Sequence, residues 1–91
     1  MTYAERIESK VRAGLAPTIF ELTDESHQHA GHAGANPSGE THFRLRVVSE
    51  RFWGLGLVER HRLVYGLLSE EMRERVHALT LQTLTPDELT P

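Results

Sequence analysis

The sequence has no cysteine among its 91 residues. That absence excludes a disulfide framework, a cysteine nucleophile and any thiolate metal site supplied by this chain alone. A bound metal would therefore need histidine or carboxylate ligands, or thiolates from a partner. No apolar run approaches the roughly 20 residues of a membrane span, and the segment MTYAERIESKVRAG is too charged for a signal-peptide core. We expect a cytoplasmic protein with no membrane partner.

Lysine is also scarce, because nine of the ten cationic residues are arginine. The formal net charge of −3 argues against a generally basic nucleic-acid-binding protein. The charge is uneven, since residues 44–62 hold five arginines and two glutamates, a local charge of 5 − 2 = +3. The forked guanidinium suits contacts to carboxylate or phosphate. We expect most of these arginines on solvated helix and sheet surfaces.

Histidine, in contrast, is concentrated in DESHQHAGHAGANPSGETHF, residues 24–43, which holds four of the six. Its glycines, asparagine and proline favour a long loop over residues 25–41. Neutral imidazole is a good ligand for zinc and iron. His27, His29 and His32 could together capture zinc, or they could be solvated loop residues. A glycine-rich loop gives a zinc site no rigid scaffold.

Hydrophobic periodicity predicts a first helix from residue 2 to about residue 13, ended by Gly14 and Pro17. Its apolar stripe is Tyr3, Ile7, Val11 and Leu15. The segments TIFELTDE (18–25) and HFRLRVVS (42–49) alternate as half-buried strands. In the second of them, Phe43, Leu45 and Val47 face away from the arginines. These two strands are expected to pair as a wide hairpin.

A principal helix is predicted over residues 57–74, with Leu57, His61, Val64 and Leu68 on one stripe. VHALTLQTL (76–84) follows as a third strand, with His77 on the face of Leu79 and Leu81, and Val76 and Ala78 opposite. TPDEL then offers Thr85 as the cap of one final turn. The order α-β-β-α-β-α predicts a single α+β domain over residues 1–91, a three-stranded sheet with helices packed on one face.

Four ordered segments, DESxxHAGH, GETHFRLRVVSERFWGL, LVERHRLVYGLLSEEM and VHALTLQTLTPDE, resemble the BolA family over about residues 3–89. The resemblance implies a class II KH-like fold. It also implies an adaptor that pairs with a monothiol glutaredoxin carrying a [2Fe-2S] cluster with glutathione, and no cofactor in the isolated protein. The family's label of transcriptional regulator implies DNA binding as an alternative, for which Arg60, His61 and Arg62 are the candidate contacts.

The family pattern implies one cluster ligand in the hairpin loop and one at the start of the third strand. These positions are His29, with His32 as its neighbour, and His77. Replacing thiolate by histidine on one iron raises the reduction potential of a cluster. For the remaining histidines we expect structural roles: His42 as a hydrogen-bonded sheet residue, and His61 as a hydrogen-bonded, semi-buried residue of the main helix.

No catalytic site is expected from the sequence. Asp24 and Glu25 alternate across a strand end, so they are not placed as a paired acid and base. Ser26 has no oxyanion loop beside it. We therefore predict that the protein is not an enzyme.

Overall fold

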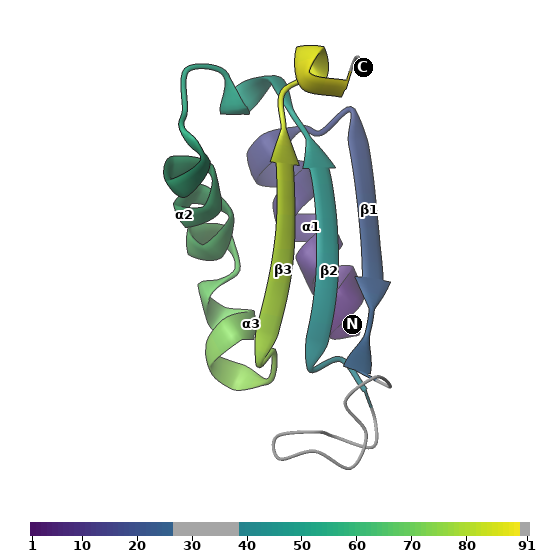
Figure 1. Cartoon of the computed structure of the whole chain (residues 1–91). Coiled ribbons are helices and arrows are strands. Elements are labelled where there is room, and N and C mark those ends of the chain that lie inside the picture. The colour runs from purple at the N-terminus through teal and green to yellow at the C-terminus, as the bar shows by residue number, and fades with distance from the viewer. Residues whose placement is uncertain (27–38, 90–91) are drawn as a thin grey trace.

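The computed structural model describes residues 1–26 and 39–89. Its elements are α1 (Tyr3–Leu15), β1 (Ile19–Asp24), β2 (His42–Val48), η2 (Glu50–Phe52), α2 (Leu57–Leu67), α3 (Ser69–Glu74), β3 (Ala78–Leu84) and η3 (Pro86–Leu89). The strands form one sheet in the order β1-β2-β3, with β1 antiparallel and β3 parallel to β2. Figure 1 shows α1 behind the strands and α2 beside β3. The predicted α+β architecture is confirmed.

The apolar stripe of α1 supplies much of the core. Ile7, Val11 and Leu15 are fully buried, as the periodicity predicted. At the N-terminus, the Thr2 hydroxyl accepts from the Glu5 N–H at 3.0 Å while the Glu5 carboxylate accepts from the Thr2 N–H at 2.8 Å. This capping box satisfies two helix-end donors and sets where α1 begins.

The prediction that Gly14 stops the first helix is wrong, because α1 runs through Gly14 to Leu15. Two side chains from beyond β2 satisfy its last carbonyls: Ser49 Oγ donates to Leu15 O at 2.5 Å, and Arg51 Nη1 donates to Gly14 O at 2.7 Å. The helix then ends at Ala16, whose φ of 43° is left-handed. Glycine at position 14 instead permits close packing, since a Cβ there would lie 2.8 Å from Leu67 Cδ2.

The two faces of the sheet differ as the alternation predicted. Phe43, Leu45 and Val47 of β2 are buried against the helices. Arg44 and Arg46 point to the other face, with 62% and 34% of their side chains exposed. The helices therefore pack on one face, and the opposite face is polar.

The prediction of one continuous helix over residues 57–74 is wrong. The chain breaks at Leu68, whose φ of −108° and ψ of 18° separate α2 from α3. Leu68 itself is buried, whereas Leu57, expected on the same inner stripe, has 63% exposure. After the break, Glu71 of α3 is fully buried and is held by Arg6 and Lys10 of α1. The chain breaks at Leu68 because α3 then brings Glu71 to these two cations of α1.

The third strand starts later than predicted, at Ala78 rather than residue 76. Both the His77 N–H and the Ala78 N–H donate to Thr41 O, at 2.7 and 3.2 Å. Regular alternation begins only after this shared acceptor. As a result Val76 is buried in the core with Leu79, and His77 is exposed, so the predicted assignment of faces at the start of this strand is wrong.

The chain closes with the single turn predicted after Thr85, formed as the 3-10 helix η3. The Thr85 N–H donates to Glu88 Oε1 at 2.8 Å, and the Glu88 N–H donates back to Thr85 O at 3.0 Å. Within residues 1–26 and 39–89, no helix combines the length and the apolar character needed to cross a membrane.

Candidate functional site

The candidate site lies at the end of the sheet where β1 stops and β2 and β3 start. Asp24 closes β1, His42 opens β2, and His77 precedes β3. The parallel register pairs His42 with Ala78, which makes His77 a neighbour of the first residue of β2. His29 and His32, with His27, fall in residues 27–38 and so lie outside the described residues.

Two imidazoles meet at this end. The ring centroids of His42 and His77 are 6.0 Å apart, with 33° between the ring planes. His42 Nδ1 is 2.8 Å from the Thr41 hydroxyl, so the expected hydrogen bond of His42 is confirmed. Sequence reasoning missed the contact between the two rings. The signal was available, because a parallel β2–β3 pair brings the starts of both strands to one edge.

The backbone under His77 is anchored although its side chain is exposed. Its N–H donates to Thr41 O at 2.7 Å, and Thr41 is buried with 1% exposure. An exposed imidazole on a fixed backbone can present a nitrogen lone pair to a metal centre without reorganising the fold. The structure therefore gives His77 the accessibility that a ligand to an external group requires.

The imidazoles of His42 and His77 are the candidate metal ligands at this end. The Asp24 carboxylate is engaged in hydrogen bonds from Ser26 and the Glu40 N–H. Among residues 1–26 and 39–89, no group of three or more His, Cys, Asp or Glu side chains is arranged to hold a metal ion. A [2Fe-2S] cluster is usually held by four protein ligands, and histidine can replace cysteine on one iron. The residues that the structure describes thus fit part of a shared cluster site, with thiolates from elsewhere, and do not form a complete site by themselves.

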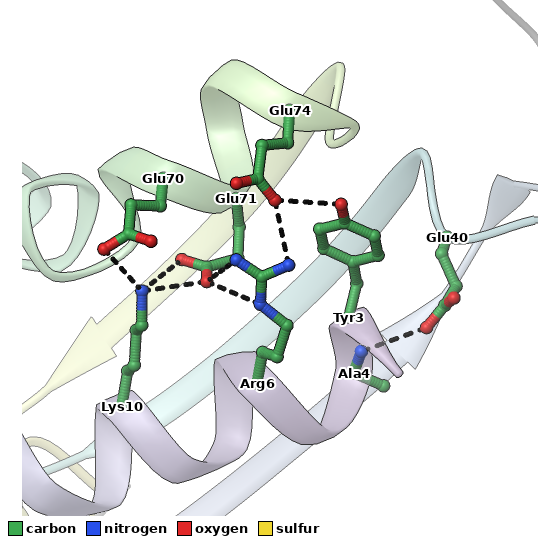
Figure 2. A network of polar contacts seen from close by, with 8 residues as sticks. All are labelled: Tyr3, Ala4, Arg6, Lys10, Glu40, Glu70, Glu71 and Glu74. Atoms are coloured by element: carbon green, nitrogen blue, oxygen red, sulfur yellow. Dashed lines mark hydrogen bonds and ion pairs between the residues drawn. The ribbon is translucent and has the colours of Figure 1, made fainter. Parts of the chain in front are cut away.

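A polar network fixes α1, α3 and the start of β2 around this end (Figure 2). The buried Glu71 carboxylate lies 2.9 Å from Arg6 Nη2 and 2.8 Å from Lys10 Nζ. Burial opposes ionisation of Glu71, but hydrogen bonds and charge from Lys10 and Arg6 outweigh it and lower the pKa of the carboxyl. Glu40, just before β2, accepts from the Ala4 N–H at 3.1 Å. Ion pairs therefore join α1 to α3, and the Glu40 hydrogen bond joins α1 to the segment just before β2.

The three residues predicted to contact nucleic acid are not brought together on one surface. Arg60 has only 12% of its side chain exposed. Its guanidinium donates to Leu55 O, Thr83 O and Glu88. His61 is half-buried, and its Nε2 has no hydrogen-bond partner in the described part of the chain, so its expected hydrogen bond at that atom is not found. Arg62 is exposed.

The open face of the sheet carries a groove of about 320 Å³, lined by Glu21, Thr23, Arg44, Arg46, Thr80, Leu81 and Gln82. Arg46 lies 3.2 Å from the Glu21 carboxylate, and Arg44 lies 3.1 Å from Glu25. These pairs balance the charge of the face. Arg44 and Arg46 therefore do not form a free basic patch on this face.

The chain resembles known proteins in both sequence and structure. The family described as BolA-like protein matches residues 11–88. SufE-like protein 1 of Arabidopsis thaliana is 48% identical over 88 residues, which cover 92% of this chain and 24% of that protein. The DNA-binding transcriptional regulator BolA of Escherichia coli is 45% identical over 85 residues, covering 93% of this chain and 77% of that protein. The chain thus spans about a quarter of the first relative.

Solved structures agree with the sequence comparison. The BolA domain of SufE1 from Arabidopsis thaliana superposes with a TM-score of 0.88 at 45% identity, covering 98% of both chains. BolA1 from the same plant gives the same TM-score at 44% identity, covering all of this chain and 98% of that one. The family match, the relatives and the shared fold lead to one conclusion: the chain belongs to the BolA family.

Proposed function

We propose that this protein is a non-enzymatic adaptor that binds a monothiol glutaredoxin and supplies a histidine ligand to a [2Fe-2S] cluster held between the two. The observation that carries the proposal is the exposed His77 ring on an anchored backbone, 6.0 Å from His42, in a chain without cysteine. Such a chain can bind a cluster only with thiolates from elsewhere. A glutaredoxin cysteine and glutathione supply them.

In this proposal His77 offers the ligand nitrogen, and Thr41 holds the backbone that directs it. His42 adds a second ring at the same end, itself oriented by the Thr41 hydroxyl. The bound cluster would carry one-electron chemistry, at a potential raised by imidazole in place of thiolate. The second ligand predicted from the sequence is His29, with His32 as its neighbour. Iron-sulfur cluster handling or iron regulation would be the cellular role.

The test mixes the protein with a monothiol glutaredoxin, iron, sulfide and glutathione under anaerobic conditions, and records the visible absorption and circular dichroism. We expect a cluster spectrum that depends on both proteins. His77→Ala is expected to shorten the cluster lifetime at least about tenfold, by analogy with the loss of a residue supporting a metal ligand. The control is Thr80→Ala, an exposed residue of β3. A His77→Ala complex with wild-type spectrum and lifetime would exclude His77 as a ligand.

DNA binding is the second candidate, favoured by the name of the E. coli relative. The internal contacts of Arg60 and the ion pairs of Arg44 and Arg46 argue for weak binding. We expect duplex affinity in the non-specific range, at or above about 10⁻⁶ M at physiological salt, with a steep loss between about 50 and 200 mM salt. Sequence-selective, nanomolar binding of labelled duplex, with no cluster-dependent gain for glutaredoxin, would favour this second function.

A further inference from the structure

Asp24 and Ser26 form a hydrogen-bonded clamp where β1 ends. Asp24 Oδ1 accepts from the Ser26 N–H at 2.9 Å and from the Ser26 hydroxyl at 2.5 Å. Asp24 Oδ2 accepts from the Glu40 N–H at 3.0 Å. The carboxylate thereby joins residues on both sides of the undescribed segment. Because the Ser26 hydroxyl hydrogen is donated to Asp24, its oxygen is left to act as an acceptor.

The clamp reaches β2 through that oxygen. Ser26 Oγ accepts from the Thr41 N–H at 2.8 Å and from the His42 N–H at 3.1 Å. Ser26 has 6% exposure and Thr41 has 1%, so water does not readily replace this acceptor. Removing the hydroxyl would take this acceptor away from the buried Thr41 N–H and from the half-buried His42 N–H.

From Thr41 the same chain of bonds continues to His77. The Thr41 N–H donates to Ser26 Oγ, and the Thr41 carbonyl accepts from the N–H groups of His77 and Ala78. His77 precedes β3, so the regular ladder does not hold it. An ordinary link between β1 and β2 already exists, because the Glu25 N–H donates to His42 O at 2.7 Å. The clamp therefore does more than close the hairpin, since it leads on to the backbone of His77.

The backbone just before β2 adopts a left-handed conformation that brings the Glu40 N–H to Asp24. Gly39 and Glu40 have φ values of 80° and 65°, both left-handed. A Cβ on Gly39 would lie 3.2 Å from Asp24 Oδ2. Left-handed backbone at a non-glycine residue carries a cost and persists where surrounding contacts enforce it. At Glu40 those contacts are the bond from its N–H to Asp24 and the bond that its carboxylate accepts from the Ala4 N–H.

We propose that Asp24 and Ser26 are positioning residues for His77: through Thr41 they fix the backbone that directs its imidazole toward a metal centre. The inference rests on the proposed function, because it gives the clamp a purpose at the cluster ligand. Supporting residues around metal ligands change metal affinity by about 10–100-fold when removed. The clamp acts at the level of the backbone, where it sets the direction of the ring.

The experiment compares Ser26→Ala with Ser49→Ala. Ser49 is a matched control, because it is also buried and also bridges backbone groups, but at the other end of β2. The first measurement is hydrogen exchange of the Thr41 and His77 N–H groups in the protein without cluster. The second is the lifetime and circular dichroism of the cluster in the glutaredoxin complex. Ser26→Ala is expected to speed both exchange rates and to shorten the lifetime about tenfold, with Ser49→Ala close to wild type in both.

The lost cluster lifetime should be restored by a variant that keeps the hydroxyl. Ser26→Thr keeps the hydroxyl and is expected to restore most of the lifetime. If Ser26→Ala does not fold, Asp24→Asn replaces it, because Asp24 is exposed and the change removes one acceptor oxygen. Unchanged His77 exchange and cluster lifetime, or equal changes in Ser26→Ala and Ser49→Ala, overturn the inference. If the wild-type protein forms no cluster with glutaredoxin, the proposed function fails, and exchange at His77 still decides whether the clamp fixes its backbone.

Discussion

Replacing Glu71 by alanine is predicted to destabilise the fold by more than any other single carboxylate change at the α1–α3 contact. Glu71 is fully buried and lies within 3 Å of both Arg6 Nη2 and Lys10 Nζ. Removing one partner of a buried ion pair costs about 3–5 kcal/mol. Arg6 and Lys10 keep 25% and 33% side-chain exposure and retain contacts with Glu74 and Glu70. We therefore expect the lower end of that range, about 3 kcal/mol.

The assay is urea unfolding followed by far-ultraviolet circular dichroism. For small proteins, a loss of about 3 kcal/mol lowers the midpoint by roughly 1–3 M at an unchanged slope. Glu71→Gln keeps the volume and one acceptor oxygen, so we expect a loss of about 2 kcal/mol. The matched control is Glu70→Ala, whose side chain is 59% exposed and 3.6 Å from Lys10. That change should stay within about 1 kcal/mol. Equal midpoint shifts in Glu71→Ala and Glu70→Ala would refute the reasoning.

Three further predictions use other contacts. Gly14→Ala should lower the free energy of unfolding by about 1–2 kcal/mol because the new methyl group meets Leu67. Gly66→Ala has open space around the new methyl group and should raise the free energy of unfolding by about 0.5–1 kcal/mol. Urea midpoints that move in the same direction in the two variants would contradict this prediction. Hydrogen bonds from Arg60 and the Thr85 N–H lower the pKa of Glu88 from 4.5 to about 2, so its stabilising effect is complete above pH 4.5 and disappears as the pH falls toward 2. The difference in free energy of unfolding between wild type and Glu88→Gln should therefore shrink as the pH falls over that interval. A difference that stays constant would count against this role of Glu88. Single alanine variants of His29 and His32 should each keep part of the cluster lifetime and the double variant less, whereas wild-type behaviour of all three would remove this segment from the site.

The regular elements followed from the sequence where local periodicity decides the structure. The stripe Ile7, Val11 and Leu15 is buried because one face of α1 meets the sheet. The alternation of β2 placed its arginines opposite its apolar residues, as observed. In both cases the burial of one face against a single partner dominates, and periodicity records that burial directly.

The break at Leu68 could not be read from the sequence. No proline stands at the junction, Gly66 lies within α2 two residues before the break, and LLSEEM continues a helical pattern. The break serves contacts with α1, where Arg6 and Lys10 hold Glu71. A carboxylate that is expected to be solvated becomes buried when two cations from a distant element reach it, and this depends on tertiary packing.

At the end of the sheet that carries His42 and His77, local sequence also predicted part of the structure and tertiary contacts decided the rest. The family resemblance implied His77 as a cluster ligand, whereas periodicity placed its ring on the same strand face as Leu79 and Leu81. Its exposure follows from the shared acceptor Thr41 O, which delays the start of β3. The contact of His77 with His42 depends on the crossover that makes β3 parallel to β2. The role of Asp24 and Ser26 was missed because their partners, Glu40 and Thr41, are many residues away.

The internal role of Arg60 was also hidden from the sequence. Its neighbours in the chain suggested an exposed basic cluster, and its position on α2 does not by itself reveal where the guanidinium ends. In the fold it reaches the carbonyls of Leu55 and Thr83 and the carboxylate of Glu88. An arginine that bonds backbone carbonyls at the edge of the sheet is structural, and only tertiary geometry separates it from one that binds phosphate.

The central claim, that His77 supplies a nitrogen ligand to a cluster shared with a glutaredoxin, is tested most directly by pulsed electron paramagnetic resonance of the reduced complex. This chain alone is labelled with ¹⁵N-histidine, so that any ¹⁵N coupling to the cluster must come from it. We predict a strong ¹⁵N coupling in the wild-type complex, altered or lost in His77→Ala. A reduced cluster with no ¹⁵N coupling, or with a coupling identical in wild type and His77→Ala, would contradict it.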